Sequence, residues 1–351
     1  MRFLDIPRKV ARRVRSYVQT ARDRSSVRGL ILAYHRVVAL KDDPQLLAVT
    51  PENFKEQLEV LNREFIPKSL VAISNSKRQA QPFVALTFDD GYADNYQFAK
   101  PMLETANVPA TFFVAGAFIN GDREFYWDEL EQLLLNPAMG QGRLIVRLPS
   151  NTLEWNLDEW NDSYDALGWN VTHSNRPSAR HEAYVTLCSM LKHQPDAIRQ
   201  SVLDQIAEFA GITRHVREQN RSMQPQELAI LGQSPLFEVG AHTVTHPSVP
   251  TLSSIEMKKE LIGSKVHLEK ITGRAVVSFA FPYGERSDFN AVAVNAVQAA
   301  GFRQCCINCP GLLVRRTSRM MLPRFIVRNW NGEEFSRHLH TWLTQQTAVY
   351  L

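Results

Sequence analysis

Two pairs of side chains in the sequence have the chemistry of a metal-dependent catalytic site. Asp89 and Asp90 are adjacent in the segment TFDDG, and neighbouring carboxylates repel each other unless a cation lies near them or one is protonated. His242 and His246 are four residues apart in the segment HTVTH, a spacing at which two imidazoles on a helical turn can face one ion. An Asp-Asp-Gly sequence by itself is also common in turns. Together the two pairs supply nitrogen and oxygen ligands for a divalent ion with open coordination positions.

Short apolar runs alternate with helical stretches from Gly29 onward, and the polar candidates follow the apolar runs. The runs predicted as strands are GLILAYHRV, PFVALTFDDG, VPATFFVAG, LFEVGAHTVTH, VVSFAFPYGE and GFRQCCINC. Helices are predicted between them, one of which begins at Pro51 with Thr50 as its N-cap. Repeated strand and helix units indicate a parallel sheet of the α/β class, and we predict a (β/α) barrel. The C-terminal ends of its strands would bring the candidates to one face.

Single residues at other strand ends could complete the site. His35 lies in AYHRV after the first apolar run; an isolated histidine is usually structural, but its place on the same barrel face favours a functional role. Arg324 lies in LPRF near a late strand, where it could serve the site or form a salt bridge at the barrel end. The clustered cysteines at 305, 306 and 309 have no fourth ligand nearby, so we interpret them as packing in a buried strand rather than as a zinc site.

The chain divides into three predicted parts. Residues 1–28 form a basic amphipathic arm, residues 29–330 form the barrel, and residues 331–351 form a helical tail. Residues 120–234 interrupt the barrel pattern and hold four of the six tryptophans, Trp127, Trp155, Trp160 and Trp169. We interpret this range as a largely helical insertion, whose aromatic residues either bury in a cover over the barrel or form a wall for sugar rings.

Composition excludes several classes of protein. The 351 residues are 44% hydrophobic with a net charge of +4, which is typical of a globular protein and too weak to indicate nucleic acid as a partner. The sequence has no glycine-rich phosphate loop, no apolar run of about 18 residues that could span a membrane and no secretory signal. We therefore expect a cytoplasmic protein. The arm at residues 1–28 has a local charge of +7 and could contact an anionic membrane or pack on the barrel.

The segments TFDDG, HTVTH and FPYG, in this order, resemble the polysaccharide deacetylase superfamily, also called the NodB-homology or carbohydrate esterase family 4 proteins. The resemblance covers most of residues 29–330 outside the insertion, and it implies a distorted seven-stranded (β/α) barrel. A histidine before the aspartate pair, here His35, is similar to the circularly permuted members that deacetylate poly-N-acetylglucosamine.

The resemblance also implies roles for the candidate residues. Asp89 would be the general base and His35 the general acid, while the backbone N–H of Tyr283 would bind the oxyanion. The implied metal ligands are Asp90, His242 and His246. The family arginine that steadies the base is replaced by Ala280 here, and Arg324 is our candidate for its substitute.

The function implied is metal-dependent removal of N-acetyl groups from a glycan built from N-acetylglucosamine, or from its precursor, with release of acetate. Zinc is the expected ion, and cobalt, nickel or iron would also suit the ligand set. Two alternatives remain open at this point. One is an O-acetyl esterase or a deformylase that acts on a lipid-linked sugar, and the other is a degenerate glycan-binding module without turnover.

Overall fold

Parallel strands form a barrel in the computed structural model, which describes residues 29–73, 81–136, 140–157, 168–314 and 316–345. In their order around the barrel, the strands are β12 (Leu322–Pro323), β11 (Gln304–Ile307), β10 (Ser278–Ala280), β9 (Phe237–Ala241), β6 (Ala110–Val114), β5 (Phe83–Phe88), β1 (Gly29–Tyr34) and β13 (Phe325–Ile326). Every neighbouring pair in this order is parallel. The short strand β4 (Ile66–Pro67) pairs with β5 beside this path.

The barrel closes through one short segment. Only Arg324 separates β12 from β13, so the two are halves of a single strand. Leu322 in the first half is opposite Cys306 of β11, and Phe325 in the second half is opposite Leu32 of β1. The segment thus joins the two edges of the sheet, and the barrel has seven strands when its halves are counted together. The predicted (β/α) barrel is confirmed.

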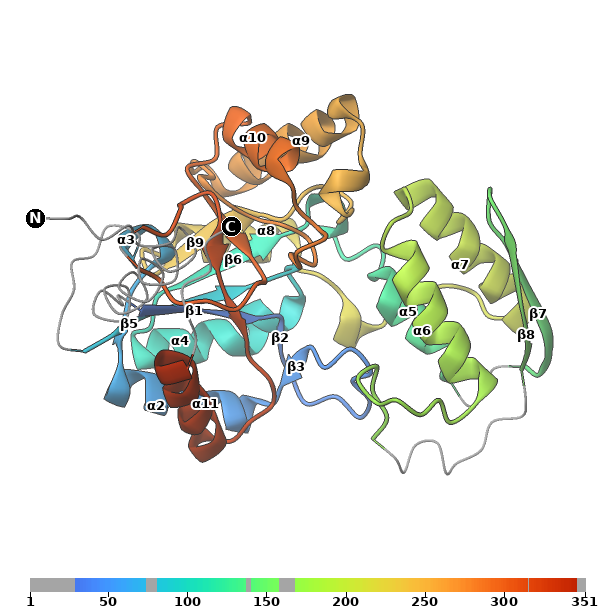
Figure 1. Cartoon of the computed structure of the whole chain (residues 1–351), viewed down its shortest axis with the longest axis horizontal. Coiled ribbons are helices and arrows are strands. Elements are labelled where there is room, and N and C mark those ends of the chain that lie inside the picture. The colour runs from blue at the N-terminus through green and yellow to red at the C-terminus, as the bar shows by residue number, and fades with distance from the viewer. Residues whose placement is uncertain (1–28, 74–80, 137–139, 158–167, 315, 346–351) are drawn as a thin grey trace, which may run out of the picture.

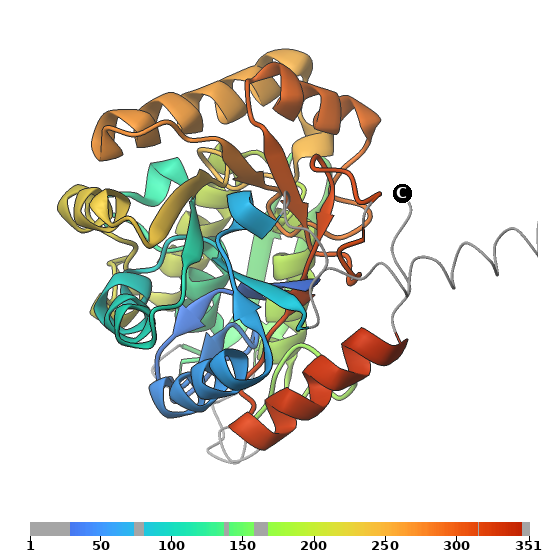
Figure 2. The ribbon, with the colours of Figure 1, turned by 90° about the vertical axis from the view of Figure 1, so that its left-hand side faces the viewer.

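Helices surround this sheet (Figure 2). They are α2 (Pro51–Glu64), α4 (Lys100–Ala106), α8 (Pro225–Gln233), α9 (Ser254–Thr272), α10 (Ala291–Ala299) and α11 (Gly332–Gln345). The short helix α3 (Leu70–Ile73) instead packs in an apolar cluster with strand residues such as Phe113 and Cys306. Helix α2 begins as predicted, because the Thr50 hydroxyl accepts a hydrogen bond of 3.3 Å from the backbone N–H of Asn53. Helix α9 begins with a capping box between Ser253 and Glu256 and ends at Gly273, whose φ is 67°.

Alternate residues of the strands face two different cores, as the pleat of a strand requires. The larger core lies between the sheet and the helices and includes the stacked rings of Tyr34, Phe88 and Phe112. A smaller apolar cluster includes Phe113 and Cys306, together with other strand residues. Both cysteines of β11 are buried in this strand, which confirms the predicted strand.

Residues 126–210 form a separate unit at the right of Figure 1, on the side of the barrel toward which β1 runs. The unit contains α5 (Tyr126–Leu134), an antiparallel hairpin of β7 (Gly142–Arg147) and β8 (Thr152–Leu157), α6 (Ala179–Leu191) and α7 (Asp196–Ala210). Its hydrophobic core is shared with Tyr92, Ala115 and Phe118, which come from outside this range. Helix α8 lies inside the range predicted as an insertion but packs on α9 and β9 of the barrel.

Some predictions fall outside the described residues. These are the whole arm at 1–28, the end of the tail at 346–351, and Trp160. The three-part division of the chain stays a prediction. Among the described helices, none combines the length and the apolar character needed to cross a membrane.

We predict that Gly240 is required for the packing of β9, the strand that leads into the loop of the histidine pair. A Cβ atom at Gly240 would lie 2.4 Å from the Phe113 ring and 3.2 Å from the carbonyl oxygen of Ser278. Gly240→Ala should therefore lower the free energy of unfolding by about 1–3 kcal/mol, the usual cost of overpacking a core. Urea denaturation measures this change. Gly140→Ala is the control, because a Cβ there meets nothing within 4 Å; equal stability of the two variants would refute the prediction.

Candidate active site

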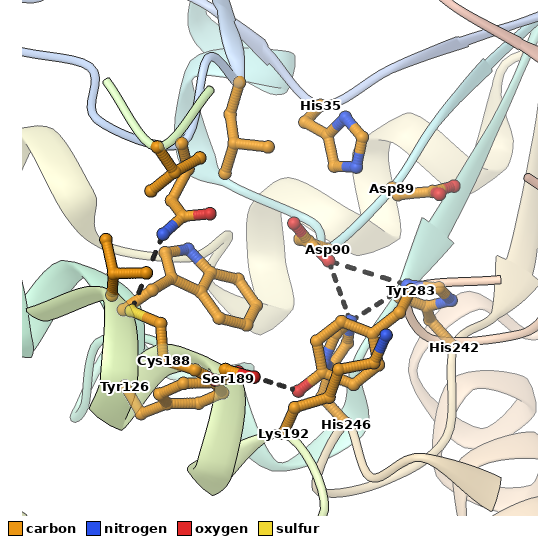
Figure 3. A pocket seen from close by; sticks show the side chains of 15 residues that line it. His35, Asp89, Asp90, Tyr126, Cys188, Ser189, Lys192, His242, His246 and Tyr283 are labelled. Atoms are coloured by element: carbon orange, nitrogen blue, oxygen red, sulfur yellow. Dashed lines mark hydrogen bonds and ion pairs between the residues drawn. The ribbon is translucent and has the colours of Figure 1, made fainter. Parts of the chain in front are cut away.

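The candidate residues come together where the strands end. His35 follows β1, Asp89 and Asp90 follow β5, and the histidine pair follows β9. Together with Tyr283, which comes after β10, they line a cavity of about 300 Å³, and Figure 3 shows these side chains close to one another. Arg324 is completely buried behind Asp89.

Three ligand atoms converge in this cavity. The Nε2 atom of His246 lies 3.2 Å from Asp90 Oδ1 and 3.2 Å from His242 Nε2, and the Nε2 atom of His242 lies 3.5 Å from the same carboxylate oxygen. Ligands that bind an ion tetrahedrally at 2.0–2.1 Å are separated by about 3.3–3.4 Å. The three distances are close to this value, so the group fits a divalent ion.

The state of the two imidazoles agrees with this fit. His242 Nδ1 is 2.8 Å from the backbone carbonyl oxygen of Ala280, so we assign the ring proton to Nδ1, which leaves a lone pair on Nε2. Burial lowers the pKa of His246 to about 4, although Asp90 opposes this shift. Burial alone would raise the pKa of Asp90, but its contacts with the two imidazoles bring it well below its ordinary value. A carboxylate and two imidazoles whose ring nitrogens face one another form an arrangement that could hold a divalent cation.

The histidine pair lies on an irregular loop rather than on the helical turn that its spacing suggested. Thr243 and His246 have φ values of 65° and 57°, a region that residues other than glycine rarely adopt. Two side chains from distant helices hold this loop. Glu260 of α9 accepts hydrogen bonds from the N–H groups of Val244 and Thr245, and Arg199 of α7 donates to the carbonyl oxygens of Thr245 and His246, each at 3.0 Å. Sequence analysis identified neither helper.

Asp89 is held by a two-pronged ion pair. Arg324 Nη1 lies 2.7 Å from Asp89 Oδ1, and Nη2 lies 2.6 Å from Oδ2. Nη1 also donates to the hydroxyl of Thr87 at 3.0 Å. Burial would raise the pKa of Asp89, but Arg324 is the main cause of a net decrease. The carboxylate therefore stays ionised, and Arg324 contacts it directly.

The cavity has two further polar groups near the ligand atoms. His35 is half-buried, and burial lowers its pKa even though Asp90 and Asp89 act in the opposite direction. Tyr283 adopts a left-handed backbone conformation with a φ of 61°, and Asn308 donates to its carbonyl oxygen at 2.6 Å. The centre of the Tyr283 ring lies 4.8 Å from the centre of the His246 ring.

The outer part of the cavity is formed mainly by the unit at residues 126–210. The residues of this unit that line the cavity are Tyr126, Trp127, Val171, Val185, Cys188, Ser189 and Lys192. The Trp127 ring lies 5.2 Å from that of His246, and its N–H donates to the hydroxyl of Tyr92 at 2.9 Å. Trp169 instead packs on His181 and Tyr184. Of the three candidate tryptophans that the structure describes, Trp127 lines this cavity, whereas Trp155 and Trp169 do not. The aliphatic residues beside Trp127 carry no signal in the sequence.

Comparison with known proteins points to one family. The model described as polysaccharide deacetylase matches residues 76–138 and 203–305. The expected resemblance to the polysaccharide deacetylases is confirmed. Relatives include a poly-beta-1,6-N-acetyl-D-glucosamine N-deacetylase of Escherichia coli K12, 28% identical over 44% of this chain and 24% of that protein. YxkH of Bacillus subtilis is 27% identical over 35% of this chain and 44% of YxkH. The chain thus spans less than half the length of these curated relatives.

Solved structures of polysaccharide deacetylases share the fold. The deacetylase PplD of Streptococcus pyogenes matches with a TM-score of 0.55 and 16% identity, over 90% of this chain and 99% of that one. IcaB of Ammonifex degensii matches with a TM-score of 0.53 and 15% identity, over 90% and 97% of the two chains. At this identity the likeness concerns the fold alone.

We predict that Arg199 supports metal binding through the loop of the histidine pair. Arg199→Met removes both hydrogen bonds to that loop, so the affinity for Zn²⁺ should fall by about 10–100-fold, as is common when a group that orients a ligand is lost. Competition with a coloured chelator, starting from metal-free protein, measures the affinity. Arg123→Met is the matched control. Arg123 forms an ion pair of 2.8 Å with Asp196 of α7, the helix that also carries Arg199, and this contact lies away from the loop of the histidine pair. Equal affinities in the two variants would contradict the prediction.

Proposed function

We propose that this protein is a metal-dependent hydrolase that removes N-acetyl groups from a glycan built from N-acetylglucosamine units, or from its precursor. The observation that carries the proposal is the ion pair between Asp89 and Arg324 beside the three convergent ligand atoms. A base held in its ionised form next to a metal site is the arrangement that hydrolysis by an activated water requires. The family resemblance and the named substrate of the Escherichia coli relative support this choice.

Each residue has a proposed role. Asp90, His242 and His246 would hold the ion, for which zinc is the first candidate and cobalt, nickel or iron are alternatives. The bound ion supplies Lewis acidity and lowers the pKa of a water molecule. Asp89 would accept a proton from the water that attacks the acetyl carbon. Arg324 keeps Asp89 ionised and fixes its orientation. In other members of the family this role would belong to the arginine whose position is occupied here by Ala280.

The remaining roles concern the tetrahedral intermediate and its collapse. The backbone N–H of Tyr283 stabilises the negative charge on the former carbonyl oxygen, an interaction that can contribute about 3 kcal/mol. His35 donates a proton to the nitrogen as the C–N bond breaks, so that acetate and a free amine leave. A neutral amine is a far better leaving group than its anion, which is why the site needs an acid as well as a base.

An O-acetyl esterase or a deformylase would use the same catalytic groups. The choice of an N-acetyl amide as the bond that is cleaved is therefore itself part of the proposal. A binding module without turnover would not need a buried arginine on Asp89. We also propose that the protein acts in the cytoplasm and does not bind nucleic acid. Its arm at residues 1–28, which contacts anionic lipid in this proposal, lies outside the described residues.

Acetate release tests the proposed activity. The substrates are β-1,4- and β-1,6-linked oligomers of N-acetylglucosamine, assayed before and after chelation and again after addition of Zn²⁺, Co²⁺ or Ni²⁺. We expect chelation to abolish release and metal to restore it. Asp89→Asn should lower kcat by at least about 100-fold because the base is lost. Asp196→Asn, a change on α7 outside the cavity, should behave as the parent. Equal rates for the parent and Asp89→Asn would refute the proposal.

The pH profile tests the role of Arg324. Since Arg324 holds the pKa of Asp89 below its ordinary value, the base stays ionised in the parent until the pH falls well into the acidic range. Arg324→Met should raise this pKa, so the acidic limb of kcat/KM moves to higher pH and more activity is lost at pH 5 than at pH 8. Arg324→Lys keeps the charge and should shift the limb less. An acidic limb at the same pH in Arg324→Met and the parent would show that Arg324 does not set the ionisation of Asp89.

A further inference from the structure

The unit at residues 126–210 bridges the cavity instead of lying beside it. Helix α6 is connected to barrel loops at two places, one near its middle and one at its C-terminal end, and residues of both connections line the cavity. These connections decide whether a long glycan can pass through the site or only enter it by one end.

The first bridge joins α6 to the loop before β3 (Ala48–Val49). The side-chain amide of Gln45 donates to the hydroxyl of Tyr184 at 2.8 Å and lies 3.6 Å from Cys188 Sγ. The carbonyl oxygen of Pro44 also accepts a hydrogen bond of 2.9 Å from the N–H of Val171. Gln45 and Val171 both line the cavity, so this bridge forms one of its walls.

The second bridge joins the end of α6 to the loop after β10. Lys192 Nζ lies 2.9 Å from the buried carboxylate of Asp288 and 3.2 Å from that of Glu285. The same ammonium lies 4.8 Å from the centre of the Tyr283 ring. The hydroxyl of Tyr283 is in turn 3.2 Å from that of Tyr126. This wall contains a charge pair and two aromatic rings, and Figure 3 shows Lys192 beside Tyr283.

The space between the bridges is short. Tyr184 and Lys192 are eight residues apart, which corresponds to about 12 Å along a helix. The cavity of about 300 Å³ is at the lower end of the range for small-molecule sites. Arg199, which is buried and bonded to the loop of the histidine pair, anchors the neighbouring helix α7, so the cover is fixed to the floor of the site.

We propose that this cavity accepts one N-acetylated sugar at the end of its glycan, and that Lys192 closes the side where an inner sugar of a longer chain would continue. This inference rests on the proposed deacetylase function and specifies its substrate. The enzyme removes one acetyl group per chain end, whereas an open groove would allow removal at inner sugars.

The test is the position of deacetylation. Dimers to hexamers of N-acetylglucosamine, in both linkages and labelled at the reducing end, are incubated with the metal-loaded protein and sequenced by tandem mass spectrometry. We expect one acetate lost per chain, always from the same terminal sugar, at rates that differ less than about threefold between dimer and hexamer. Loss of acetate from inner sugars would overturn this inference and leave the proposed function intact. No release from any oligomer would overturn both.

A matched pair of lysine variants tests the second bridge. Lys192→Ala removes the ion pair with Asp288, and we expect its hexamer products to include molecules deacetylated at inner sugars. Lys265→Ala is the control, since Lys265 pairs with Glu269 on α9 at 2.8 Å, far from the residues that line the cavity. It should remain specific for the terminal sugar. Thermal unfolding of both variants confirms that they are folded, and terminal-only products from Lys192→Ala would overturn the role of Lys192.

Discussion

The buried ion pair between Asp89 and Arg324 connects the fold to the chemistry. Arg324 lies between the two half-strands that close the barrel, and Asp89 lies at the end of β5, one strand beyond β1. A buried ion pair is seldom a net source of stability, because removing both charges from water costs about as much as their attraction returns. Its value here is geometric, since two parallel hydrogen bonds fix the plane of the carboxylate. Closure of the barrel and orientation of the proposed base therefore depend on the same contact.

The loop of the histidine pair also depends on side chains from other parts of the fold. His246 keeps a backbone conformation with positive φ, which is stable only where neighbouring groups hold it. In this loop, Glu260 accepts hydrogen bonds from the N–H groups of Val244 and Thr245, and Arg199 donates to the carbonyl oxygens of Thr245 and His246. These two residues belong to different parts of the chain, one to the barrel helix α9 and one to the unit at 126–210. That unit is consequently a structural component of the ligand geometry as well as a cover.

Sequence reasoning succeeded where the signal was local. Alternating apolar runs predicted the barrel strands, and the Thr50 cap predicted the start of α2. The Asp89–Asp90 and histidine pairs could be found because their types and spacing are unusual at strand ends. Arg199 could not be found, because one arginine on a polar helix resembles any solvent-exposed side chain until the tertiary fold buries it. The histidine loop was misjudged for a related reason, since its backbone is set by Glu260 and Arg199 rather than by its own residues.

The charges buried at the site explain why these parts are arranged together. Asp89 and Arg324 cancel each other, and the imidazoles of His242 and His246 would hold the proposed ion in their neutral forms. Asp90 contributes a single negative charge, so the three ligands together with a divalent ion would carry a net charge of about +1, apart from any charge on His35. A tetrahedral intermediate that carries one negative charge would neutralise this excess, whereas the uncharged amide substrate would not. Because Asp89, Asp90 and both histidines are buried, that difference would act at a lower dielectric constant than in water and would favour the transition state of the proposed reaction over the substrate.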